Sequence, residues 1–228
     1  MGTRIPIKGK RTVPTYTTLR AVSWYAFQLA RNDERARLNH MMASMAFDAF
    51  TLEAYLNHIG AVRIKFWSSL KRKLSPHEKL AVVSTDLGFD PDTSRRPWQS
   101  FVSIFKLRAL LVHGETETLP IESEVSMRPG AAIPIPLASW EQYMGIDTTE
   151  RFLDDTKAMI TDLATRAGLP PEEVFAKDNI QAATIRIEEP DEDDSGAAQQ
   201  IAAADLAIWR KLERDWPARM PGKVGGVA

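Results

Sequence analysis

Arg108 and His113, near the middle of the chain, have side chains that suit phosphate chemistry. An arginine is a permanent cation that can hold a phosphate oxygen through two parallel N–H bonds. A histidine can give and take a proton near neutral pH. Both lie in the segment Phe105–Gly114, whose glycine marks the expected end of a helix. We interpret the pair as a candidate site for cleaving an RNA phosphodiester; the alternative is a histidine that only caps its helix.

The spacing of the pair limits how it can act. Positions five apart lie about 140° apart around a regular helix, so one helix converges Arg108 and His113 poorly. Either the last turn before Gly114 is distorted, or two copies of the helix set the arginine of one chain beside the histidine of the other. We favour the second arrangement, which predicts a homodimer. In the last turn, the negative end of the helix dipole would favour a protonated His113, a ready proton donor.

The composition is that of an ordinary globular protein. The chain has 228 residues, 44% hydrophobic and 26% charged, with a net charge of -1, which predicts one principal domain with a sizeable core. The lack of cysteine excludes disulfides and thiolate nucleophiles, and it favours a reducing compartment. Arg20 and Gln28 interrupt the first candidate apolar stretch, and no apolar run approaches membrane-spanning length. We expect a cytoplasmic protein with no membrane contact.

Helices are expected to dominate the fold. Periodicity and breakers predict helices near 18–31, 34–64, 76–88, 98–113 and 148–167, the third capped by Ser75 and the last by Thr148 or Thr149. Pro129-Gly130 predicts a hairpin or extended insertion between 114 and 138, and the run 183–187 suits a short strand. The predicted fold is therefore an all-α antiparallel bundle with this small insertion and a C-terminal tail helix.

Composition changes along the chain suggest four parts. They are a basic N-terminal arm at 1–16, a helical domain at 17–185, an acidic linker at 186–196, and a C-terminal helix with a disordered tail at 197–228. The linker is too charged to pack and is interpreted as a solvated spacer, although it could compete with RNA for basic residues.

These features together resemble the HEPN superfamily, a group of all-helical proteins named for higher eukaryotes and prokaryotes nucleotide-binding domains. Its hallmark is an arginine and a histidine separated by four to six residues near the end of a late helix, matched by Arg108 and His113 and followed here by Gly114. The segment 45–60, with Phe-Thr-Leu-Glu-Ala-Tyr-Leu-Asn at 50–57, looks like the second helix of bacterial members. The resemblance covers roughly residues 18–168.

The resemblance implies a metal-independent endoribonuclease that acts as a toxin or in antiviral defence. Members dimerise so that two arginine-histidine motifs form one cleft, in which His113 would move the proton and Arg108 would stabilise the charge on the phosphorane. RNA, a second copy of the chain, and an antitoxin or nucleotidyltransferase are the implied partners. No metal or cofactor is implied, and the scattered histidines show no ligand spacing such as His-Glu-x-x-His.

Ala109 departs from the family pattern. Active members usually have a polar residue, most often asparagine, after the arginine, and alanine can neither orient the histidine nor bind a phosphate oxygen. The alternative function is therefore a catalytically silent module that binds RNA or a protein partner and uses the region of Arg108 as a dimer interface.

Two further groups of residues are candidates for the site. Glu53 and Asn57 lie four apart on a small-residue face and are expected to point inward, where Glu53 would pair with Arg108, with another arginine or with a backbone N–H. The strongest basic patch, interleaved with Phe66 and Trp67, suits single-stranded RNA. The alternative, which is the usual one for a run of charges, is a solvated surface with Trp67 in the core. The cations of the patch are Arg63, Lys65, Lys71, Arg72 and Lys73.

Overall fold

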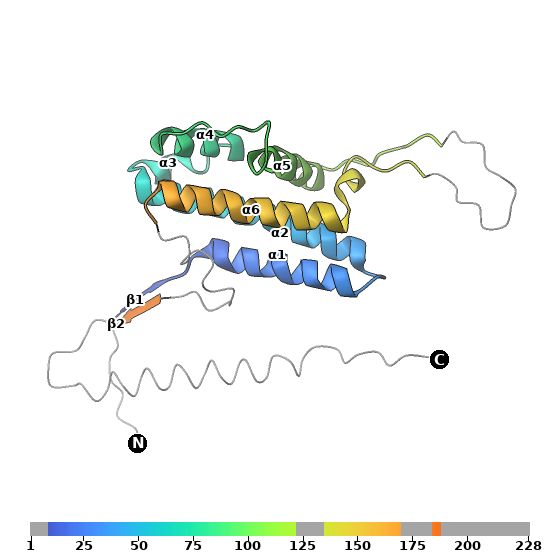
Figure 1. Cartoon of the computed structure of the whole chain (residues 1–228), viewed down its shortest axis with the longest axis horizontal. Helices are drawn as coiled ribbons and strands as arrows, with labels where there is room; N and C mark the ends of the chain where they lie inside the picture. The colour runs from blue at the N-terminus through green and yellow to red at the C-terminus, as the bar shows by residue number, and fades with distance from the viewer. Residues whose placement is uncertain (1–8, 122–134, 170–183, 188–228) are drawn as a thin grey trace, which may run out of the picture. The chain divides into compact units, whose positions relative to one another are not determined.

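The computed structural model describes residues 9–121, 135–169 and 184–187, which Figure 1 draws in colour. They belong to two compact units, of which one spans Val13–Ala183 and the other joins Met1–Thr12 with Thr184–Ala228. In the second unit, strands β1 (Gly9–Thr12) and β2 (Thr184–Ile187) pair antiparallel. β2 lies in the run where we expected a short strand, whereas the pairing of the basic arm as its partner was not expected.

The first unit is an all-α bundle, as predicted. Its helices are α1 (Thr15–Asn32), α2 (Arg37–Arg63), α3 (Trp67–Leu70), α4 (Pro76–Asp86), α5 (Trp98–Val112) and α6 (Ile146–Arg166), with a 3-10 turn, η1 (Glu141–Tyr143), before α6. α1, α2 and α6 run alongside one another, and α5 lies against α2 and α6 (Figure 1). α2 touches each of the other α-helices in this unit, so it is the central element of the bundle.

The helix starts depend on which oxygen accepts the free N–H groups of the first turn. Ser75 and Glu78 form the capping box that begins α4, as its sequence predicts. α6 instead begins at Ile146, because the carbonyl of Gly145 accepts both the backbone N–H and the hydroxyl of Thr149. The predicted cap at Thr148 or Thr149 is therefore wrong, since Thr149 bonds inside the first turn.

Several predicted segments fall partly or wholly outside the described residues. The described ends of the insertion, 115–121 and 135–138, contain neither helix nor strand. Arg186 and Ile187, the first two residues of the predicted acidic linker, belong to β2. The centre of the insertion at 122–134, the rest of the linker and the C-terminal helix lie outside the described residues, so these predictions stay predictions.

Gly60 allows α2 to approach the buried ring of Trp67. A Cβ built at Gly60 would lie 2.2 Å from two atoms of the Trp67 indole, which is only 1% exposed. Alanine favours a helix over glycine by about 1 kcal/mol, but over-packing a core costs about 1–3 kcal/mol. Because the clash is with a large ring rather than the end of a flexible chain, we take the upper end of that cost, about 3 kcal/mol, and expect Gly60→Ala to lower the free energy of unfolding by about 2 kcal/mol net.

Urea unfolding of the variant measures this effect. Val62→Ala, two residues along α2 at a position 54% exposed, is the control and should change stability by less than about 0.5 kcal/mol. A Gly60→Ala protein as stable as the wild type would contradict the close approach.

Candidate functional site

The end of α5 is regular, so it does not bring Arg108 and His113 together by distortion. The helix continues through Val112, and the N–H of His113 donates to the carbonyl of Ala109 at 2.9 Å. A Cβ on Gly114 would lie 2.8 Å from the carbonyl oxygen of Leu110. Glycine therefore follows the helix because the chain passes close to its last turn, and not because of a left-handed backbone angle.

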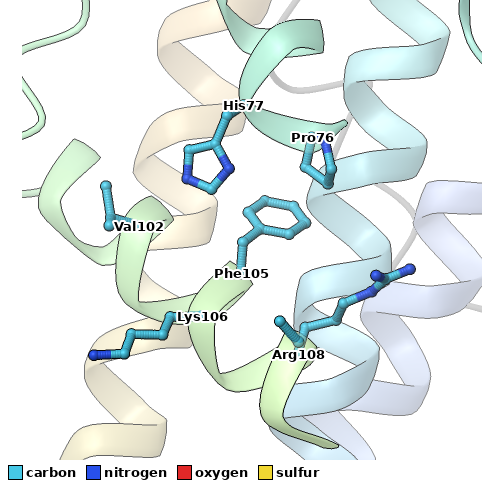
Figure 2. Close-up of a pocket in the computed structure, with 7 residues that line it drawn as sticks. Pro76, His77, Val102, Phe105, Lys106 and Arg108 are labelled. Atoms are coloured by element: carbon cyan, nitrogen blue, oxygen red, sulfur yellow. The ribbon is translucent and has the colours of Figure 1, made fainter. Parts of the chain in front are cut away.

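Arg108 and His113 line two neighbouring hollows on the surface of the bundle. The first, here called the Arg108 hollow, has a volume of about 300 Å³ and lies between the start of α4 and the side of α5 (Figure 2). The second, the His113 hollow, has a volume of about 450 Å³ and extends from the end of α5 to Glu117 and Ser139. Lys106 and Ala109 line both hollows. One chain thus places the pair side by side and not in a single hollow.

Arg108 has a donor with no acceptor in the described part of the chain. Its side chain is half-buried, and Figure 2 shows it extending from α5 away from His77. The Nε atom is buried and makes no hydrogen bond to any described residue. A buried donor without an acceptor costs free energy, so a movement of the side chain that let a phosphate oxygen reach Nε would remove that cost. His113, in contrast, is exposed.

The structure does not pair Glu53 with Arg108. Glu53 Oε1 instead accepts a hydrogen bond of 2.7 Å from Nζ of Lys79, whose side chain is only 4% exposed. α4 packs on α2 and turns this lysine inward, and a buried ammonium needs a counter-charge. Asn57 is half-buried, and its Oδ1 has no hydrogen-bond partner among the described residues.

The basic patch is a surface with one exposed aromatic ring. Phe66 is 68% exposed, whereas Trp67 is buried in the core, as the structural alternative for this patch expected. Lys65, Lys71, Arg72 and Lys73 are exposed. Nε of Arg63 donates to Asp86 Oδ2 at 3.0 Å, so its charge is already balanced by α4. Phe66, rather than Trp67, is therefore the ring that could stack on a base.

A buried polar cluster that the sequence did not reveal fixes α6 against α2 and α5. The Thr156 hydroxyl donates to Asp48 Oδ2 at 2.6 Å, and Asp155 accepts hydrogen bonds from the Arg96 guanidinium and the Ser100 hydroxyl. Burial is the main cause that raises the pKa of Asp48 to about 7. None of these residues lines either hollow. The cluster supports the site by holding its helices.

His77 and Lys106 are the residues of the site that the sequence analysis missed. Both line the Arg108 hollow, Lys106 from the same helix as Arg108 and His77 from the first turn of α4. The available signal was weak: His77 follows the Ser-Pro helix start, and only the packing of α4 on α5 brings it near Phe101 and Phe105.

Comparisons with protein-family models, with curated proteins and with solved structures found no match to this chain. No described helix is long and apolar enough to cross a membrane. No group of three or more histidine, aspartate or glutamate side chains in residues 9–121, 135–169 and 184–187 is arranged to hold a metal ion.

Proposed function

We propose that this protein is a metal-independent endoribonuclease of the HEPN type that acts as a homodimer. The observation that carries the proposal is the half-buried Arg108, whose Nε has no hydrogen-bond partner among the described residues. It lines the hollow next to that of the exposed His113, at the end of the same helix. The all-α bundle agrees with the resemblance in sequence. The proposal includes a role as a toxin or in antiviral defence, with an antitoxin or nucleotidyltransferase as the partner to look for in neighbouring genes.

The proposed reaction needs a clamp for the phosphate and a group that moves protons. The 2′-oxygen of the ribose attacks the adjacent phosphorus, the bond from phosphorus to the 5′-oxygen breaks, and a 2′,3′-cyclic phosphate remains. The 2′-hydroxyl loses a proton and the leaving 5′-oxygen gains one, which is the role of His113. Arg108 stabilises the negative charge that builds on the phosphorane oxygens.

A two-fold axis near the end of α5 would complete the site. In a symmetric dimer the same surface of each chain meets its copy, so Arg108 of one protomer can approach the His113 hollow of its partner. Val112, 53% exposed beside His113, supports this placement because a dimer would bury it. Sedimentation should show a dimer at micromolar concentration, and a monomer that RNA does not alter would exclude the composite site.

The direct test is cleavage of single-stranded RNA in EDTA. We expect the wild type to leave 2′,3′-cyclic phosphate or 3′-phosphate ends. Ala109→Asn should raise the rate, because Ala109 lines both hollows and an amide there can reach the phosphate or the histidine. Ala109→Gly is the matched control, since it adds no polar group and should not raise the rate.

The second candidate function is a silent module that binds RNA or a protein. Ala109 favours it, because the shared rim of the two hollows has no polar side chain at that position. The cations around the exposed Phe66 would then supply the RNA contact. No cleavage by the wild type or by Ala109→Asn, together with RNA binding, would select this function.

A further inference from the structure

The Arg108 hollow has apolar and aromatic walls with cations at its rim. Pro76, Val102 and Phe105 form part of the wall. Figure 2 shows the Phe105 ring lying near His77, while Lys106 and Arg108 extend to opposite sides. We propose that this hollow binds one nucleobase of a single-stranded RNA, with the neighbouring phosphates of the strand at Lys106 and Arg108.

His77 supplies the ring on which the base can stack. Its side chain is exposed, yet its ring is held by edge-to-face contacts, 5.3 Å from the Phe101 ring at 86° and 6.0 Å from the Phe105 ring at 64°. The capping box at Ser75 fixes the start of α4 and so the position of the histidine. A ring that is already oriented loses little freedom when a base stacks on it.

The size and charge of the hollow fit a base within a strand. Its volume of about 300 Å³ lies at the lower end of small-ligand pockets, which suits a single ring system. No acidic residue in the described part of the chain lines it. Glu53 of α2 is engaged with Lys79, and Glu78 of α4 is engaged with the N–H of Ser75. Among the described residues, a polyanion therefore meets cations without a facing carboxylate.

Single-stranded RNA is the occupant that this arrangement favours. Its bases are unpaired and can enter an aromatic pocket, whereas those of a duplex are stacked inside the helix. The inference rests on the proposed function in one respect: the phosphate at Arg108 is the one proposed to be cut. The base in the hollow is then next to the scissile bond, and His77 and Lys106 help to place that bond.

Binding of a 2′-O-methyl oligouridylate, measured by fluorescence anisotropy, tests the subsite. The 2′-O-methyl group blocks the attacking oxygen, so the probe reports binding alone. His77→Ala should weaken binding about 5- to 150-fold, the range for losing one stacked base. His77→Phe, which keeps a ring, should bind within about twofold of the wild type. Binding of inorganic polyphosphate, which has charge but no bases, should be unchanged in both variants.

Controls separate stacking from folding and from general charge. His40→Ala, at a histidine on α2 that lines neither hollow, should bind as the wild type does. If His77→Ala lowers the melting temperature, the comparison uses His77→Phe and His77→Leu instead of His77→Ala, since both side chains cover Phe101 and Phe105. The phenylalanine variant should then bind normally and the leucine variant weakly.

A salt titration tests the phosphate contact at Lys106. Lys106→Gln should reduce the slope of log affinity against log salt by about 0.7, the value for one phosphate of a single strand. Arg35→Gln, which removes one charge from the exposed turn before α2, should leave the slope unchanged.

Two results would contradict the proposed subsite. In the first, His77→Ala binds the oligouridylate as tightly as the wild type does. In the second, His77→Ala weakens the binding of polyphosphate and of the oligouridylate by the same factor. If Lys106→Gln leaves the slope of log affinity against log salt unchanged, Lys106 does not contact a phosphate of the strand. These results are independent of catalysis. Binding that depends on His77 without any cleavage keeps the subsite and rejects the ribonuclease, whereas cleavage without a His77 effect does the reverse.

Discussion

His113→Ala is expected to abolish RNA cleavage, and Arg108→Ala to slow it by about a hundredfold or more. The histidine moves the proton and the arginine stabilises charge that exists only in the transition state, so each loss should lower kcat. His113 is exposed and ends its helix through a backbone hydrogen bond, so its variant should keep the wild-type fold. Single-turnover cleavage in EDTA, with circular dichroism as the check on folding, measures both effects.

Mixing the two inactive variants tests whether the site is shared between protomers. If Arg108 of one chain acts with His113 of its partner, a mixed dimer has one site with both residues and one with neither. Random exchange makes half of the dimers mixed, so about a quarter of the wild-type activity should return. A site within one chain would stay inactive in every dimer, and no recovery after demonstrated subunit exchange would reject the shared site.

The stability of the protein should fall as pH rises from about 4 to about 7, because of Asp48. Its folded-state pKa is raised from 3.8 to about 7, mainly by burial; the neighbouring Asp155 also raises it, whereas the Thr156 hydrogen bond and the charge of Arg20 lower it. Between these values the unfolded chain releases the proton while the folded chain keeps it. Three units at about 1.4 kcal/mol each give a loss of about 4 kcal/mol, complete above pH 7.

Asp48→Asn should remove this pH dependence, because the amide cannot ionise and its oxygen can still accept the Thr156 hydrogen bond. Urea unfolding at pH 4 and at pH 8 measures it, and the variant should gain about 4 kcal/mol relative to the wild type between the two. Asp162→Asn is the control: this partly exposed carboxylate pairs with Arg166 one turn along α6, and its loss should leave the wild-type profile. Identical profiles for Asp48→Asn and the wild type would show that Asp48 is not protonated in the fold.

The order and class of the main helices followed from local signals in the sequence. Ser75 and Pro76 begin α4 where a capping box and an N1 proline predict it, and the apolar period of Trp98–Val112 predicts α5 almost to the residue. The elements that the sequence did not predict are short or depend on packing against another element. α3 is a single turn that depends on burying Trp67 under Gly60, a contact that no local pattern records.

Some properties of the candidate site follow from the sequence alone, and others depend on tertiary packing. The sequence alone determined that Arg108, His113 and Gly114 lie near the end of one helix, because helical spacing and the glycine are local properties. It also determined that five-residue spacing separates the two side chains around that helix. Tertiary packing alone decided that Glu53 meets Lys79, that Asp48 is buried beside Thr156, and that His77 faces the hollow next to Arg108. These contacts join residues far apart in the chain, and which partners meet is set by how α4, α5 and α6 pack on α2.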